Sequence, residues 1–412
     1  MILEFSVTNF LSFKDKVTLS MLANQTSGLN DNYIICNDRK ILKTVAIYGA
    51  NASGKSNLFK VLTNVIIMLS NSNNFRPDVK LPIIPFMFDK RMQDKPSEFE
   101  IKFITKNVRY VYGFIADKNK IYEEYLYYYP NGREAKIFDR TSTSNYSFPQ
   151  KDESTLKDIA KRNSENKFFL ATATNWNYEK TKDAYEFLTK GIGTCFNLED
   201  LKNISFKFYE ENANDLKIFA LDFLKKADLS IEDYKISKIN IPKEAMINIP
   251  EVLKESMPKD LFAYKVEFKH NKSENYLLFD EESMGTQILF CFIPFMMEAL
   301  QNNKVLIIDE LDRSMHPFVV EMIVQMFNDK DINKNGAQLI FNTHDTNLLD
   351  LNILRRDQIW FTEKNSEDGS SDLYSLSDFS VRKDENFGRN YLLGRYGAVP
   401  FIKNNFNLWE KE

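Results

Sequence analysis

The sequence has 412 residues, of which 43% are apolar, and this predicts a globular protein of one large domain or two moderate ones. Acidic and basic residues nearly balance, 58 against 54, so the net charge of −4 excludes a strong global attraction to DNA or to an acidic membrane. The three cysteines form no C-x-x-C pair, which argues against a disulfide framework or a thiolate zinc site and favours a reducing compartment.

No targeting or membrane segment is predicted. The first residues, Met1–Phe5, lack the basic and apolar regions of a signal peptide. The most apolar window, Ile288–Met297, is too short to span a bilayer. We therefore expect a cytoplasmic protein with no membrane contact.

Residues 1–150 are expected to form an N-terminal lobe that contains two kinds of structure. Apolar and polar residues alternate over Leu3–Val7 and Val17–Met21, which predicts half-buried strands. The same alternation over Phe99–Arg140 predicts an antiparallel meander. Between them, the apolar run Val45–Tyr48 predicts a buried strand, and apolar residues at helical spacing begin ten residues after it.

The segment Gly49–Ser56 has the spacing G-x-x-x-x-G-K-S of a phosphate-binding P-loop and lies between a predicted strand and a predicted helix. Its glycines let backbone N–H groups face the phosphates, and the dipole of the following helix adds attraction. Lys55 is expected to reach the β- and γ-phosphates of ATP, and Ser56 is expected to hold Mg²⁺. A fortuitous glycine turn is the less favoured alternative. The predicted nucleotide-binding residues here are Gly49, Asn51, Ala52, Ser53, Gly54, Lys55, Ser56 and Asn57.

Residues 151–235 are predicted to be mainly helical, and because they fall between the nucleotide motifs we expect an inserted helical lobe. A C-terminal lobe is expected over residues 236–412. Strands are predicted near Tyr264–Phe268 and Tyr276–Phe279, a helix follows over Ile288–Leu300, and strands and helices should alternate after it.

Ser283 and Gly285 lie just before this helix, in the segment Glu282–Gln287. The segment resembles the signature loop of the ATP-binding-cassette (ABC) superfamily, although it has Ser-Met-Gly-Thr in place of Ser-Gly-Gly-Gln. Ser283 and the Gly285 backbone would present donors to a γ-phosphate at a helix N-terminus. A simple helix N-cap explains Ser283 equally well.

Two carboxylates and a histidine follow predicted strands. The apolar strand Val305–Ile308 ends in Asp309 and Glu310, the Walker B arrangement, in which Asp309 supports Mg²⁺ and Glu310 polarises the attacking water. A later strand ends in His344, which matches the superfamily's switch histidine that contacts the γ-phosphate. The predicted catalytic residues are therefore Lys55, Glu310 and His344, and solvated strand ends are the alternative for the last two.

The order of these motifs is typical of the ABC superfamily. The resemblance implies an α/β fold, the ABC-ATPase head, in which helices flank the P-loop sheet and an N-terminal antiparallel β subdomain and the helical lobe are added. It also implies a head-to-tail homodimer in which the Ser-x-Gly loop of one subunit completes the ATP site of the other. Asp312 matches the loop through which such subunits touch, and Arg313 and His316 lie beside it. Gln93 is a weak candidate for the Q-loop glutamine. The segment Asn9–Lys14 occupies the place where the N-terminal strands of related ATPases approach the base.

Three segments define a narrower resemblance. The start of the chain, Glu4–Phe13, resembles SMC, RecF and OLD-like ATPases. The segments Ile47–Leu58, Asp309–Pro317 and Leu392–Pro400 resemble prokaryotic abortive-infection ATPases of the RloA/AbiL type. Such ATPases are typically paired, in phage defence, with a separate nuclease-like effector of the Toprim type. The resemblance thus implies an ATP-gated sensor or regulatory subunit, a homodimer or higher oligomer, that controls such an effector.

The chain itself is not expected to be a nuclease. A Toprim domain would need an isolated Glu and an Asp-x-Asp strand end after His344, and neither is found. The main alternative function is a DNA-binding clamp of the SMC/RecF kind in DNA repair or maintenance, which would need a basic stripe. The Lys-rich pieces Lys225–Lys226 and Lys235–Lys243 are more typical of solvated faces. A transporter nucleotide-binding domain is less favoured still, because it would lack the C-terminal tail.

Overall fold

A six-stranded sheet carries the P-loop. The computed structural model describes residues 1–25, 28–195, 198–227, 229–240, 262–271, 273–380 and 385–400. The first five strands of this central sheet are parallel, and only the last pairs antiparallel. The strand order is β11 (Ile192–Cys195), β15 (Val305–Ile308), β16 (Gln338–Asn342), β5 (Thr44–Tyr48), β17 (Ile359–Lys364) and β18 (Ser371–Ser375). Because parallel strands end at one edge, the loops after β5, β15 and β16 meet there.

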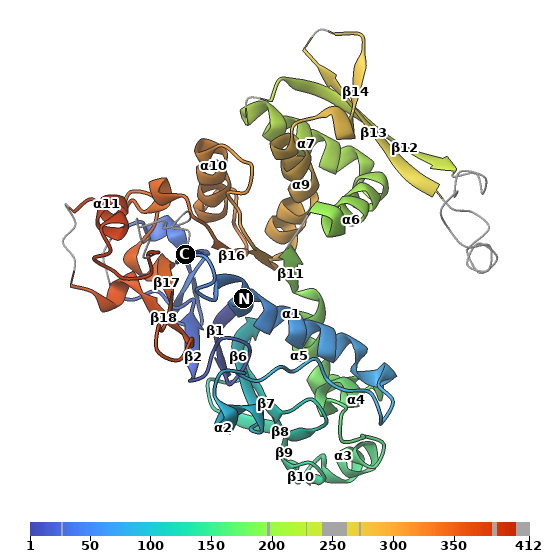
Figure 1. Cartoon of the computed structure of the whole chain (residues 1–412). Helices are drawn as coiled ribbons and strands as arrows, with labels where there is room; N and C mark the ends of the chain where they lie inside the picture. Colours follow the sequence, from blue (N-terminus) through green and yellow to red (C-terminus); the bar gives the residue numbers. More distant parts are fainter. Residues whose placement is uncertain are drawn as a thin grey trace, which may run out of the picture.

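An antiparallel sheet of seven strands forms the N-terminal subdomain (Figure 1). It confirms both the predicted early strands and the meander. Gln338 of β16 joins the two sheets, because its side chain accepts from the Ile2 amide at 2.6 Å and donates to the Ile2 carbonyl at 3.0 Å. The strand order is β10 (Asn145–Ser147), β9 (Ala135–Ser142), β8 (Ile121–Tyr129), β7 (Val108–Ala116), β6 (Ser97–Thr105), β1 (Ile2–Thr8) and β2 (Val17–Ser20), and a separate hairpin contains β3 (Tyr33–Cys36) and β4 (Arg39–Leu42).

The central sheet separates two hydrophobic cores, because alternate residues of each strand face opposite sides. Val45 and Ile47 of β5 belong to the core shared with the antiparallel sheet, whereas Ala46 and Tyr48 face the other core. All five β5 residues are buried, as expected of a parallel strand covered on both faces. The helices are α1 (Lys55–Asn71), α2 (Lys90–Gln93), α3 (Glu153–Ala160), α4 (Phe169–Asn175), α5 (Glu179–Lys190), α6 (Leu198–Glu211), α7 (Ala213–Lys226), α9 (Met284–Asn302), α10 (Pro317–Asn328) and α11 (Phe387–Leu392).

Residues 151–235 do not form one inserted helical lobe. Leu156, Phe169 and Phe187, from α3, α4 and α5, are buried in the core of the antiparallel sheet. The chain then contributes β11 to the central sheet, and Leu216 and Phe223 of α7 are buried in the second core. The helical pattern predicted these helices, but the periodicity of a helix does not reveal which core its apolar face joins.

A three-stranded sheet, β12 (Ile231–Asn240), β13 (Phe262–His270) and β14 (Tyr276–Leu278), packs with α6, α7 and α9 at the far end of the molecule (Figure 1). Strands β13 and β14 confirm the prediction, whereas β12 occupies residues expected to be helical up to 235. Helix α9 is long and apolar enough to cross a membrane by length and composition alone. It is a core helix here, since Phe290 and Ile293 are fully buried and Phe290 stacks on Tyr209 at 4.3 Å.

Candidate functional site

The P-loop runs from the end of β5 to the start of α1, as predicted. A Cβ atom at Gly49 would lie 2.4 Å from the Thr362 carbonyl oxygen of β17, so this position has no room for a side chain. Gly54 has φ +117°, and a Cβ there would lie 2.5 Å from the Ser371 hydroxyl. Only glycine adopts this backbone without strain at so close an approach. The two glycines therefore form a loop whose backbone can approach a phosphate closely.

Lys55 is the first residue of α1, and its ammonium group lies inside the loop. Its Nζ donates to the carbonyls of Gly49 at 2.8 Å and Ala50 at 3.1 Å. Burial lowers the pKa of Lys55, while the carboxylates of Asp309 and Glu310 act in the opposite direction. A cation held within the loop by its own carbonyls is suited to phosphate oxygens.

Ser56 and Asp309, the two predicted Mg²⁺ ligands, lie side by side. The Ser56 hydroxyl donates to Asp309 Oδ1 at 3.0 Å. Asn342 at the end of β16 donates its side-chain amide to the same oxygen. A hydroxyl and a carboxylate beside a phosphate cradle are the hard oxygen ligands that Mg²⁺ takes with nucleotide. The residues therefore fit a Mg²⁺–nucleotide complex.

Glu310 follows Asp309 in a left-handed backbone conformation, with φ +56°. Its amide donates to Asn342 Oδ1 at 2.5 Å, so one buried side chain holds both acids of the Walker B pair. The Glu310 carboxylate lines the cleft beside the P-loop. Sequence reasoning missed Asn342, although an amide directly after the apolar run Leu339–Phe341 was the available signal.

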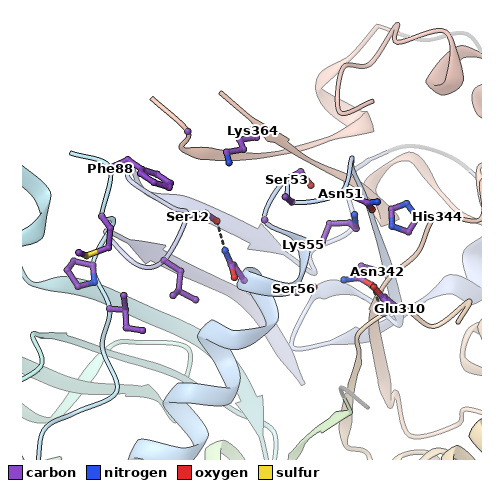
Figure 2. A pocket seen from close by; sticks show the side chains of 18 residues that line it. Ser12, Asn51, Ser53, Lys55, Ser56, Phe88, Glu310, Asn342, His344 and Lys364 are labelled. Atoms are coloured by element: carbon purple, nitrogen blue, oxygen red, sulfur yellow. Dashed lines mark hydrogen bonds between the residues drawn. The ribbon is translucent and has the colours of Figure 1, made fainter. Parts of the chain in front are cut away.

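His344 also lines this cleft, on the side of Glu310 and Asn342 (Figure 2). Its backbone amide donates to Asp312 Oδ2 at 3.1 Å, which ties the switch loop to the predicted subunit-contact loop. Burial, and then the nearby Lys55 ammonium, lower the pKa of His344 below its ordinary value of 6.5. The neutral ring can donate one N–H toward a phosphate without carrying a charge of its own.

The cleft has a volume of about 500 Å³ and has an apolar end away from His344. Leu11 and Ser12, which belong to the segment Asn9–Lys14 expected to approach the base, line it. Phe88 and Met87 line it as well, and their side chains are 74% and 52% exposed. Figure 2 shows Phe88 at the opposite end of the cleft from His344. The full lining is Leu11, Ser12, Asn51, Ala52, Ser53, Gly54, Lys55, Ser56, Asn57, Ile84, Pro85, Met87, Phe88, Glu310, Asn342, His344, Lys364 and Gly369.

The apolar wall at Ile84–Phe88 was not predicted from the sequence. Exposed aromatic and aliphatic side chains beside a phosphate loop suit the flat face of a nucleobase. Lys364 Nζ lies 5.8 Å from the centre of the Phe88 ring and adds a cation to the same wall. Gln93, the weak Q-loop candidate, donates to the Met87 carbonyl at 2.7 Å and does not line the cleft.

Ser283 and Gly285 do not line this cleft. Ser283 is the N-cap of α9, where its hydroxyl accepts from the Thr286 amide at 3.2 Å, and both Ser283 and Met284 are exposed. A Cβ at Gly285 would lie 2.4 Å from the Ser314 carbonyl, so this loop packs on the segment after Asp312. The structure therefore separates the signature-like loop from the P-loop of the same chain.

The neighbouring surface contains the two residues predicted beside the contact loop. Arg313 is exposed. His316 caps α10, because its Nδ1 accepts from the Phe318 amide at 3.2 Å, and its ring lies 5.1 Å from the Phe318 ring. Phe318 is 75% exposed, which is unusual for so large an apolar side chain.

The fold and the site together define a P-loop ATPase of the AAA type, with the P-loop, Asp309, Glu310 and His344 gathered at one edge of a parallel sheet. The chain belongs to the family described as "AAA domain, putative AbiEii toxin, Type IV TA system", whose model matches residues 45–350. No curated protein matches the chain at a significant level.

Several solved structures resemble the chain at low sequence identity. The SMC head domain from Thermotoga maritima has 11% identity and a TM-score of 0.42, with 91% of this chain and 98% of that chain covered. The Smc head domain with a coiled coil and joint from Pyrococcus yayanosii has 12% identity and a TM-score of 0.45, with 96% and 99% covered. The Smc head domain with an extended coiled coil, bound to the C-terminal domain of ScpA, from Pyrococcus furiosus has 15% identity and a TM-score of 0.40, with 91% and 96% covered.

Proposed function

We propose that this protein hydrolyses Mg²⁺–ATP as an ATP-gated homodimer in the cytoplasm, and that it regulates a separate effector, a Toprim-like nuclease, in an anti-phage abortive-infection system. One observation carries the ATP-gated dimer: the cleft gathers Lys55, Glu310 and His344, whereas the exposed Ser283 and the half-buried Gly285 lie outside it. Half of an ABC-type site is thus available to a second chain.

The side chains in the cleft divide the chemistry among them. Ser56 and Asp309 would hold Mg²⁺, which when bound would supply positive charge to the phosphates. Lys55 and the loop amides bind the phosphate oxygens. Glu310 polarises the attacking water and orients it toward the terminal phosphate, and the neutral His344 donates a hydrogen bond to that phosphate.

The exposed start of α9 is suited to the second half of the site. Helix α9 is 19 residues long, so its N-terminus carries a full helix dipole and free N–H groups. Ser283 is exposed at this terminus, and Arg313 is exposed nearby. A γ-phosphate bound to the P-loop of a second subunit would meet these donors, and its loss on hydrolysis would weaken the contact between the subunits.

The effector role rests on the tail resemblance and on the family. The family description names a putative toxin of a toxin–antitoxin system. This supports an effector that acts against the host cell, rather than a role in DNA repair or maintenance. Two of the lysines that a DNA clamp could use have partners within the chain. Lys226 pairs with Asp222 at 2.7 Å, and Lys235 lies 3.9 Å from the centre of the Tyr276 ring. Residues 241–243 of the same Lys-rich piece lie outside the described residues.

Mixing two inactive variants tests the composite site. Lys55→Ala disables the P-loop, and Ser283→Arg blocks the signature-like loop, so each homodimer should lose ATP hydrolysis. In a random mixture half of the dimers are mixed, and each mixed dimer has one intact site of two, so about a quarter of wild-type activity should return. A mixture that stays inactive, or a Ser283→Arg variant with wild-type activity, would overturn the composite site.

A pulldown tests the effector role. Glu310→Gln should bind ATP and remain dimeric, because binding is intact and water activation is lost. The trapped variant is used as bait in its native host, with Lys55→Ala as the matched control that cannot bind ATP. Recovery of a nuclease-like protein with the first bait and not the second supports the proposal. Recovery of duplex DNA without a protein would favour the SMC/RecF-like clamp instead.

A further inference from the structure

Asn9 belongs to the segment expected to approach the base, yet its side chain is buried and does not line the cleft. It follows β1 in a left-handed backbone conformation, with φ +52°, which asparagine adopts more readily than most residues. A buried amide needs hydrogen-bond partners. Those of the Asn9 side chain lie in the wall segment, residues 84–96, which carries the apolar wall of the cleft.

The Asn9 side chain joins the two ends of the wall segment. Its Oδ1 accepts from the Phe86 amide at 3.0 Å. Its Nδ2 donates to the carbonyls of Met92 and Lys95, each at 2.9 Å. One end of the amide therefore meets an N–H group and the other end meets carbonyls, which matches the one acceptor and the two donors of an asparagine side chain.

The bond to Phe86 bears directly on the exposed ring of the wall. The Phe86 side chain is fully buried, and its ring meets the Phe88 ring edge-on, with 5.7 Å between the ring centres. Phe88 itself is largely exposed, and the buried Phe86 ring supports it from the protein side. Because Asn9 holds the backbone of Phe86, it also sets the position of the ring on which Phe88 rests.

The same turn holds the wall segment at a further point. Leu11 has φ +51°, an uncommon conformation for a bulky residue, and its amide donates to the Ile84 carbonyl at 2.9 Å. The backbone groups of Phe10 and Phe13 pair with each other and close a tight turn. Leu11 and Ile84 both line the cleft. The turn after β1 therefore fixes the wall segment through Leu11 as well as through Asn9.

We propose that Asn9 is a positioning residue for the nucleobase, which holds the wall segment so that the Phe88 ring meets the base. A wall that is already in place loses less entropy when nucleotide binds. Asn9 has this role only if the cleft binds ATP, as proposed above. The phosphate end of the cleft is built by the P-loop and by strand ends of the central sheet, so it should not depend on Asn9.

The test compares ATP with inorganic triphosphate, which lacks the base. Asn9→Gly keeps the left-handed backbone without strain and removes the amide. The Kd for ATP should rise about two- to tenfold, the cost of ordering one side chain on binding. The Kd for triphosphate, measured by displacement of a fluorescent ATP analogue, should stay unchanged.

Asn166→Ala is the matched control. Asn166 is also a buried amide, and it donates to the carbonyls of Arg76 at 2.7 Å and Val79 at 2.9 Å, which do not line the cleft. This variant should bind both ligands like wild type.

A double-mutant cycle with Phe88→Ala shows whether Asn9 acts through this ring. If it does, Asn9→Gly should weaken ATP binding much less in the Phe88→Ala background than in wild type. Equal losses in the two backgrounds, or an equal rise in Kd for ATP and triphosphate, would mean that Asn9 only stabilises the fold, and the positioning role would be refuted. Wild-type affinity of Asn9→Gly for ATP would refute it as well.

Two measurements keep the outcomes distinct. Asn9→Asp preserves the shape of the side chain and the bond from Phe86, but it faces the carbonyls with a carboxylate oxygen. The same selective loss of ATP binding is therefore expected of Asn9→Asp if Asn9→Gly does not fold. Wild type and Lys55→Ala are titrated first with the fluorescent analogue. Binding by wild type alone supports the ATP site, whatever the Asn9 variants then show. If wild type does not bind, the ATP site and the role of Asn9 both fail.

Discussion

Removal of the Asn342 side chain should separate catalysis from nucleotide binding. Asn342 donates to Asp309 and accepts from the Glu310 amide at 2.5 Å, and it is fully buried at the end of β16. Asn342→Ala removes both bonds while the P-loop, Lys55 and the apolar wall at Phe88 stay in place. We therefore expect the Walker B pair to lose its orientation and the affinity for ATP to change little.

The magnitude follows from the lost hydrogen bond to a charged group. Such a bond contributes about 1.5–3 kcal/mol. If the whole of it is felt when the attacking water and Mg²⁺ are positioned, kcat falls about 10- to 150-fold, since each 1.36 kcal/mol is tenfold. The assay is steady-state phosphate release by Asn342→Ala and wild type, together with titration of a fluorescent ATP analogue.

Asn328→Ala is the matched control. Asn328 is also a buried amide, its Oδ1 accepts from the Thr44 hydroxyl at 2.9 Å, and it does not line the cleft. The Asn328→Ala variant should have a lower melting temperature than wild type but the same kcat. Equal kcat for wild type and Asn342→Ala would refute the reasoning, because it would mean that Asp309 and Glu310 hold their positions without this amide.

Two further predictions address the base and the switch. Phe88→Ala should raise the Kd for ATP about 5- to 150-fold, from about 1–3 kcal/mol of lost stacking. Inhibition by inorganic triphosphate should stay unchanged, and an equal loss for both ligands would place the base elsewhere. The pKa of His344 is lowered in the folded chain, so the unfolded chain binds more protons as the pH falls through the ordinary value of 6.5, and stability should fall with it. His344→Gln should therefore lose less thermal stability than wild type between neutral pH and about pH 5.5; an equal loss in both would assign the pH dependence to other groups.

The sequence predicted the parts of the site that are encoded locally. The P-loop spacing fixes Gly49, Lys55 and Ser56 within one strand–loop–helix unit, so it could be recognised without the fold. The two motifs assign Ser56 and Asp309 separately to Mg²⁺, and the structure places the two side chains in contact through a hydrogen bond of 3.0 Å.

The residues that were missed depend on long-range packing. Phe88 reaches the cleft from a loop outside the central sheet, and its sequence neighbours carry no nucleotide motif. Asn9 holds Phe86 across 77 positions of sequence, a contact that no periodicity can reveal. The helices of residues 151–235 were predicted, but the core that each one joins depends on β11, a short strand without alternating polarity.

Contacts within one chain link the two halves of the composite site. The signature-like loop packs on the subunit-contact loop, because the Ser314 carbonyl occupies the space where a Gly285 side chain would lie. The subunit-contact loop in turn holds the switch loop, since Asp312 accepts from the His344 amide at 3.1 Å. In the proposed dimer, Ser283 serves the partner's nucleotide and His344 serves the nucleotide of its own subunit. A shift of His344 on loss of the γ-phosphate can therefore reach the signature-like loop through the contacts of Asp312 and Ser314. That loop serves the partner's nucleotide, so the two sites should respond to ATP together.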